Sequence, residues 1–88
     1  MFVFDTDVLS HVLMPARYPT LLARMAAVPR NRQYTTTITV AEMTFGAHRS
    51  SRRDYLLSQF QNRLWPNLGI LPLDFAAAEA YGQLRAQL

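Results

Sequence analysis

The sequence contains no cysteine, no lysine and no long apolar run. Without cysteine the chain has no disulfide, no thiolate metal ligand and no cysteine nucleophile, so its chemistry must use oxygen or nitrogen groups. Residues 1–4 are apolar, but no basic segment precedes them and Asp5 follows directly, unlike a secretion signal. Nowhere do about eighteen apolar residues follow one another, as a membrane-spanning helix requires. These absences favour a soluble, cytoplasmic protein without a membrane partner.

Because lysine is absent, the nine residues counted as lysine or arginine are all arginines, and they outnumber the six acidic residues. Guanidinium groups suit planar, bidentate contacts with phosphate, so the net charge of +3 mildly favours a nucleic-acid partner. GC-rich coding also produces arginine without lysine, and composition does not separate the two explanations. Half of the 88 residues are apolar, which predicts one small globular domain with a core.

Apolar periodicity divides the chain into alternating strands and helices. Residues 1–4 are predicted to form a buried strand that ends at Asp5, and residues 34–38 and 69–73 to form two more strands. Helical patterns, limited by prolines or polar caps, cover residues 8–14, 19–28, 40–48, 56–64 and 75–88. The order βααβααβα predicts an α/β fold of three layers, in which a parallel sheet is flanked by helices with right-handed connections.

Capping residues mark the starts of two of these helices. Thr39 suits the N-cap of the helix over residues 40–48, with Glu42 three residues later as in a capping box. Asp74 suits the N-cap of the last helix. That helix lacks a C-cap glycine, and its apolar stripe continues to Leu88. We therefore expect a single domain over residues 1–88 that is truncated at its C-terminus.

Two acidic side chains are expected at one edge of the sheet. Asp5 ends the first strand and Glu42 lies one turn into the helix after the second, so a parallel sheet brings both to its carboxyl edge. Mg²⁺ prefers such oxygen ligands and can align a water for attack on a phosphodiester. Each acid also has a simpler interpretation: Asp5 can cap the next helix, and Glu42 can complete the capping box of Thr39. A pair of carboxylates alone names no enzyme.

Several segments are similar to one known family. The sequence FDTDVLS at residues 4–10 resembles the opening motif of PIN-domain ribonucleases, specifically the VapC toxins of toxin–antitoxin pairs. TITVAEM at residues 37–43, with a glycine four residues after its glutamate, resembles their second motif. LPLD at residues 71–74 and AYGQLR at residues 80–85 are similar to the segment that precedes the third acid of the family. The similarity spans all 88 residues.

This resemblance implies a PIN-like fold and assigns roles to residues. Asp5 and Glu42 would be the catalytic metal ligands for Mg²⁺ or Mn²⁺. Thr6 would support the site by hydrogen bonding, and Asp7 would lie beside it, where the family often has Asn. The implied function is a metal-dependent endoribonuclease toxin with an RNA substrate, a cognate antitoxin and a second copy as partners. The chain lacks the later acids and the C-terminal strands of the family. Asp74 is not the third acid, because it lies at the helix that precedes that acid. We therefore expect weak metal binding.

Two other functions remain open from the sequence. A PIN-like chain without the later acids could be catalytically dead and act as an antitoxin-binding or self-binding module, as the open apolar stripe of its last helix suggests. Residues 5–9, DTDVL, also resemble the first motif of haloacid-dehalogenase phosphatases, in which one aspartate attacks phosphate and the second acts as acid and base. In that motif, Thr or Val stands at the position of Leu9. The motif also requires a later lysine or arginine and a downstream acid pair, and this chain has no lysine and no such pair. The nuclease is therefore favoured over the phosphatase.

Basic and aromatic residues offer weaker candidates. Arg49, Arg52 and Arg53 are possible RNA contacts, although such runs more often form a solvated link between helices. His11 and His48 have no partner at metal-ligand spacing and are expected to be ordinary helix residues. The larger aromatic residues are expected in the core or an interface, with base stacking as the less favoured role: Phe45, Tyr55, Phe60, Trp65 and Tyr81.

Overall fold

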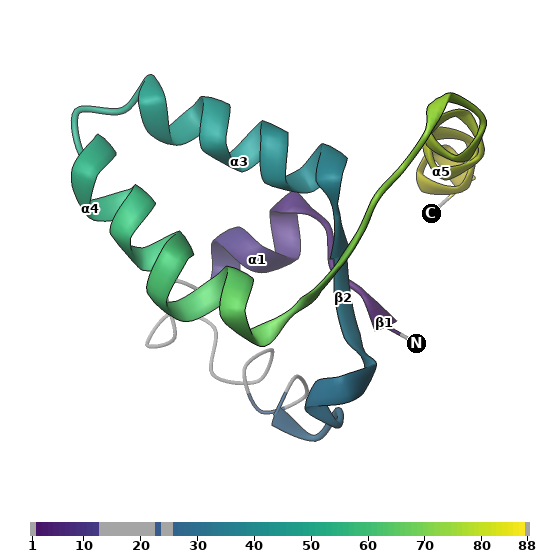
Figure 1. The fold of residues 1–88 in the computed structure, drawn as a ribbon, viewed down its shortest axis with the longest axis horizontal. Coiled ribbons are helices and arrows are strands. Elements are labelled where there is room, and N and C mark those ends of the chain that lie inside the picture. Colours follow the sequence, from purple (N-terminus) through teal and green to yellow (C-terminus); the bar gives the residue numbers. More distant parts are fainter. Residues whose placement is uncertain (1, 13–22, 24–25, 88) are drawn as a thin grey trace.

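A computed structural model describes residues 2–12, 23 and 26–87, and Figure 1 shows their arrangement. Its three short strands are β1 (Phe2–Val3), β2 (Gln33–Thr36) and β3 (Gly69–Leu71). They form one parallel sheet in the order β1-β2-β3, so β2 is the central strand. In the register of this sheet, Phe2 pairs with Gln33 and Tyr34 pairs with Gly69. The predicted α/β fold with a parallel sheet flanked by helices is confirmed.

The helices follow the strands nearly as predicted. Four α-helices are described: α1 (Thr6–Val12), α3 (Thr37–His48), α4 (Arg53–Gln59) and α5 (Phe75–Gln87). Short helical turns lie between the strands and the α-helices: a 3-10 turn at Arg30–Arg32, a π-helical turn at Phe60–Leu64 and a 3-10 turn at Trp65–Asn67. The predicted helix over residues 19–28 lies largely outside the described residues.

The core lies between α1, α3 and α4. Figure 1 shows α1 enclosed by the other two helices and the sheet, whereas α5 stands apart. The buried apolar side chains of this core come from α1, α3 and the π-helical turn: Leu9, Met43, Ala47, Phe60 and Leu64. Burial of a large apolar side chain contributes about 1.5–3 kcal/mol. This cluster therefore fixes α1 against α3, and with them the ends of the strands from which both helices start.

Strand β1 is more exposed than the apolar run at residues 1–4 predicts. Phe2 is 45% exposed and Val3 is 40% exposed. The reason is that β1 is an edge strand, which pairs with β2 alone. An apolar run indicates a strand, but it does not reveal which layers cover that strand, so the prediction of a buried β1 was wrong.

Helix α3 begins three residues before the predicted start. Its N-cap is Thr36, whose Oγ1 accepts a hydrogen bond from the backbone N–H of Thr39 at 3.1 Å. Thr39 is therefore inside the helix, at the position that a capping-box partner of Thr36 would take. The predicted N-cap at Thr39 and the capping-box role of Glu42 were both wrong, because β2 ends at Thr36 and not at Ile38.

Helix α5 begins as predicted. Oδ1 of Asp74 accepts a hydrogen bond from the N–H of Ala77 at 2.9 Å, which confirms the N-cap. No described residue of α5 is fully buried, and Phe75 and Leu84 are 81% and 56% exposed. Within the described ranges, no helix of the chain combines the length and apolar character needed to cross a lipid bilayer.

Candidate active site

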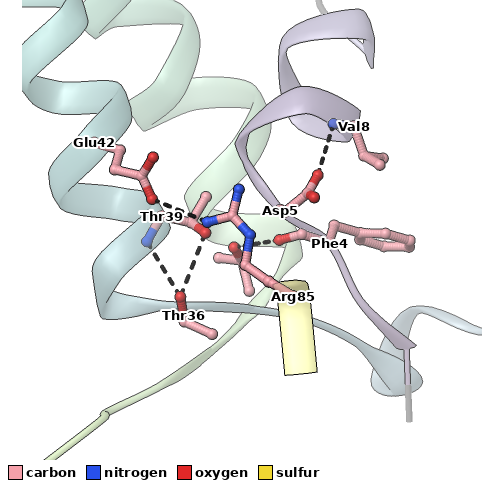
Figure 2. Close-up of polar contacts among 8 residues, drawn as sticks. Phe4, Asp5, Val8, Thr36, Thr39, Glu42 and Arg85 are labelled. Carbon is pink, nitrogen blue, oxygen red and sulfur yellow. Dashed lines mark hydrogen bonds and ion pairs between the residues drawn. The ribbon is translucent and has the colours of Figure 1, made fainter. Parts of the chain in front are cut away.

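Asp5 stands at the carboxyl end of β1, directly before α1. Its Oδ1 accepts a hydrogen bond from the N–H of Val8 at 3.0 Å (Figure 2), and its backbone carbonyl accepts one from the N–H of Leu9 at 3.1 Å. Asp5 therefore caps α1, as its simpler interpretation predicted. The side chain is half-buried, and Oδ2 makes no hydrogen bond to any described residue. One carboxylate oxygen thus fixes the side chain, and the other is available to a ligand.

Thr35 on the central strand holds the peptide that precedes Asp5. Its Oγ1 donates a hydrogen bond to the carbonyl oxygen of Phe4 at 2.7 Å, and the N–H of Phe4 donates to the carbonyl of Tyr34 at 2.8 Å. Thr35 is completely buried, so water does not compete for this hydroxyl. The backbone at the end of β1 is consequently tied to β2 on both sides of Phe4.

The next two threonines tie α3 to the sheet. Thr36, which is also buried, caps α3 through Thr39, and the two hydroxyl groups lie 3.3 Å apart. Oγ1 of Thr37 accepts a hydrogen bond from the N–H of Leu73, just beyond β3, at 3.2 Å. Thr35 and Thr37 therefore connect the carboxyl end of β2 to those of β1 and β3, and Thr36 fixes the start of α3. This is the edge where ligands bind in parallel sheets.

Glu42 lies on the second turn of α3 and pairs with a helix distant in sequence. Its Oε1 lies 3.4 Å from Nη1 of Arg85 on α5. Both side chains are partly exposed, at 44% for Glu42 and 36% for Arg85, so the ion pair is weak and replaceable. In the view of Figure 2 the Arg85 guanidinium lies between Glu42 and Asp5. The carboxyl edge of the sheet therefore carries a cationic side chain, Arg85, beside its two acids.

Thr6 and Glu42 also line a pocket of about 400 Å³ between α1, α3 and α4. Its polar lining residues are Thr6, Ser10, Glu42, Arg52, Tyr55 and Gln59. The hydroxyl of Thr6 is buried and has no hydrogen-bond partner among the described residues. Buried hydroxyl groups are rarely left unpaired, so this atom is suited to a polar ligand. The supporting role of Thr6 stays a prediction, and the free hydroxyl agrees with it.

The other candidate residues lie around this edge. Asp7 is exposed on the first turn of α1, where its negative charge interacts favourably with the positive end of the helix dipole. Arg49 and Arg52 are exposed in the link between α3 and α4, and each guanidinium covers an aromatic ring, at 5.6 Å from Phe45 and 4.5 Å from Tyr55 respectively.

Arg53 begins α4, and its Nε lies 3.2 Å from Oδ1 of Asp54. His48 is exposed at the end of α3, and the side chain of His11 is not among those described. The basic link between α3 and α4 that the sequence predicted is therefore confirmed as an exposed segment.

The donor set at this edge suits a weakly held divalent cation. In the part of the chain that the structure describes, no three His, Cys, Asp or Glu side chains form a group that could hold a metal. Asp5 and Glu42 nevertheless offer carboxylate oxygens from two elements that the buried threonines fix. Mg²⁺ is often bound through one or two carboxylates while it keeps several waters. The residues present fit such a water-rich ion, and Arg85 opposes it by occupying Glu42.

The residues that position the two acids do not stand out in the sequence. Thr35 and Thr36 fall within the predicted strand over residues 34–38, although a run of threonines at a strand end also provides hydroxyl groups for capping. Arg85 was noted in the AYGQLR segment without a role. Its partner Glu42 is 43 positions away, and a pair at that separation depends on the tertiary fold.

Comparisons with known proteins place this fold. No protein-family model matches the chain, and no curated protein matches its sequence. The solved structure of FitAcB from Neisseria gonorrhoeae is 27% identical with a TM-score of 0.79, over 98% of this chain and 66% of that chain. The structure of FitAB bound to an IR36 DNA fragment is 28% identical with a TM-score of 0.76, over 94% of this chain and 62% of that chain.

These likenesses confirm a PIN-like fold. They also support the relation to PIN-domain toxin–antitoxin proteins that the sequence motifs indicate. This chain spans slightly less than two thirds of the length of either matched chain.

Proposed function

We propose that the chain is a PIN-type toxin of the VapC group, which cleaves RNA with the help of a divalent metal ion. The observation that carries the proposal is the position of Asp5 and Glu42 at the same edge of the sheet, fixed by buried threonines. The two acids belong to the two segments that resemble PIN motifs. The likeness to FitAcB and FitAB adds support for a toxin–antitoxin relation.

Asp5 and Glu42 are the residues that would hold Mg²⁺ or Mn²⁺. A divalent ion supplies charge neutralisation for a phosphodiester and makes a bound water a better nucleophile. Asp5 can contribute Oδ2, because its Oδ1 is engaged by Val8. Glu42 contributes its carboxylate once Arg85 leaves it. Thr6 brings a buried hydroxyl that can orient a water or a carboxylate, and Asp7 adds negative charge beside the site.

The RNA strand would be held by the basic link between α3 and α4. Arg49, Arg52 and Arg53 are all exposed there. Guanidinium groups contact phosphate without regard to base sequence, so these residues would give affinity and not specificity. Two of them lie over aromatic rings, which keeps their guanidinium groups ordered at the surface.

The proposed partners are a cognate antitoxin protein and a second copy of the chain, in the cytoplasm. The exposed Phe75 and Leu84 on α5 provide apolar surface of the kind that protein partners cover. One of the two similar structures is described as FitAB bound to a DNA fragment. By this likeness, we propose that the complex of this chain with its antitoxin binds DNA.

A catalytically dead binding module is the second candidate function. It is favoured by the lack of a third metal-ligating side chain near Asp5 and Glu42 in the described part. In that case the same fold would serve only to bind an antitoxin or a second copy. The haloacid-dehalogenase alternative gains no support from the structural likenesses.

An RNA-cleavage assay in Mg²⁺ separates these candidates. We expect cleavage by the wild-type chain, a loss of at least about 100-fold in Asp5→Asn and Glu42→Gln, and no loss in Glu79→Gln, which removes an exposed acid on α5. Circular dichroism confirms that each variant is folded. A folded wild type that cleaves no RNA, with or without EDTA, would favour the binding module.

A further inference from the structure

We propose that the pocket between α1, α3 and α4 receives one nucleobase of the RNA strand, with the Arg52–Tyr55 pair stacking against it. The inference rests on the proposed function, because it takes RNA as the ligand. It adds a base-binding site that shares Thr6 and Glu42 with the proposed metal site and extends from them to α4. The pocket volume of about 400 Å³ falls within the usual range of small-molecule pockets, about 300–1,000 Å³.

The lining of this pocket suits a planar, mostly apolar ring with polar edges. Its apolar wall includes Met43, Leu56 and Phe60, of which Met43 and Phe60 belong to the core and are held firmly. Ser10, Gln59 and Thr6, whose buried hydroxyl has no partner among the described residues, provide polar groups on the same lining. Single-stranded RNA is recognised by just this combination, in which unstacked bases are stacked on side chains and hydrogen-bonded at their edges.

Arg52 and Tyr55 form a stacking pair in the pocket wall. The Arg52 guanidinium lies 4.5 Å from the centre of the Tyr55 ring, and the tyrosine is 50% exposed. Both residues line the pocket, so the pair presents a flat, polarisable surface to a ligand inside it. Bases stack on aromatic rings and on guanidinium planes, each such contact contributing enough affinity to be measured by substitution.

The pocket is also connected to the proposed reaction centre. Glu42 lines it on α3, so a nucleotide whose base enters the pocket has its phosphate groups near the acidic edge. Gly46 lines the same wall one turn further along α3, and a Cβ added there would meet no atom of the described residues within 4 Å. The missing side chain keeps this wall open. The neighbouring exposed arginines favour a phosphate-bearing ligand over an apolar peptide.

Binding of a fluorescein-labelled single-stranded RNA in EDTA tests the proposal without any cleavage. Tyr55→Ala should weaken binding at least about fivefold. Phe45→Ala is the matched control, because Phe45 is also exposed and stacked by an arginine but does not line the pocket. It should change the affinity less than twofold. Gly46→Leu should fill the pocket and weaken binding as Tyr55→Ala does, whereas Gly46→Ala should not.

Equal losses in Tyr55→Ala and Phe45→Ala would overturn the proposal, as would unchanged RNA binding by folded Gly46→Leu. The proposal would also be overturned if the pocket variants bound an apolar helical peptide more weakly than the wild type does but bound RNA equally well. RNA binding in EDTA is measured without cleavage, so its outcome does not depend on whether the chain is a nuclease. Pocket variants that lose RNA binding while the wild type fails to cleave RNA in Mg²⁺ would support the base site and contradict the nuclease. If the wild type cleaves RNA and the pocket substitutions change neither cleavage nor RNA binding, the nuclease is supported and the base site is contradicted.

Discussion

Nη1 of Arg85 lies 3.4 Å from Oε1 of Glu42, although the two residues are 43 positions apart in sequence. The contact joins α5 to α3 at the carboxyl edge of the sheet. A guanidinium and a divalent cation compete for the same carboxylate, since both are attracted by its negative charge. Metal binding at Glu42 therefore competes with this ion pair.

Removal of the Arg85 side-chain charge should strengthen metal binding. An exposed ion pair contributes about 0–1 kcal/mol, so we expect Arg85→Gln to raise the Mn²⁺ affinity by up to about fivefold. Arg63→Gln is the control, because it removes the same charge from a guanidinium that donates to Gln59 at 3.1 Å, away from Glu42. Titration calorimetry measures both affinities. Equal effects of the two substitutions would show that only net charge matters.

The buried hydroxyl of Thr35 should contribute to stability. Thr35→Val preserves the shape of the side chain but removes the 2.7 Å hydrogen bond to the carbonyl of Phe4. We expect a decrease of about 1–2 kcal/mol in the free energy of unfolding, measured by urea denaturation, because the carbonyl of the half-buried Phe4 loses the donor that the buried Thr35 supplies. Thr37→Val removes an exposed 3.2 Å bond to Leu73 and should cost less. The reverse order would contradict the role given to the buried threonine.

Gly69 on β3 should tolerate no side chain. A Cβ at Gly69 would collide with the ring of Tyr34, its partner in the register of β2 and β3. Gly69→Ala should therefore destabilise the chain by about 1–3 kcal/mol, as overpacking does. Gly46→Ala, in the middle of α3 with open space around it, should stabilise by about 0.5–1 kcal/mol. Thermal unfolding of the two variants checks the expected opposite signs, and a shift of Tm in the same direction would contradict the packing at Tyr34.

The local sequence predicted the elements of the fold well where a residue type favours only one kind of structure. Asp74 was expected to cap α5 and does so, and the alternation of strands and helices gave the parallel sheet. Threonine was harder, because it favours both strands and N-caps. The start of α3 was consequently placed at Thr39 and not at Thr36.

The candidate site was predicted only through its acids. Asp5 and Glu42 stand in recognisable segments, and the topology of a parallel sheet brings such segments to one edge. The pairing of Glu42 with Arg85 depends on where α5 folds back, and the pocket at Thr6 depends on the packing of three helices. No local pattern in the sequence records either arrangement.

Binding of Mn²⁺, followed by electron paramagnetic resonance of the free ion, tests most directly whether Asp5 and Glu42 form one metal site. The account predicts weak, saturable binding of one ion to the wild type. Asp5→Asn and Glu42→Gln should each lower the affinity by about tenfold or more. Asp54→Asn, which removes an acid that is paired with Arg53 elsewhere, should leave it unchanged. Mn²⁺ binding that is equally strong in the wild type and in Asp5→Asn would contradict the central claim.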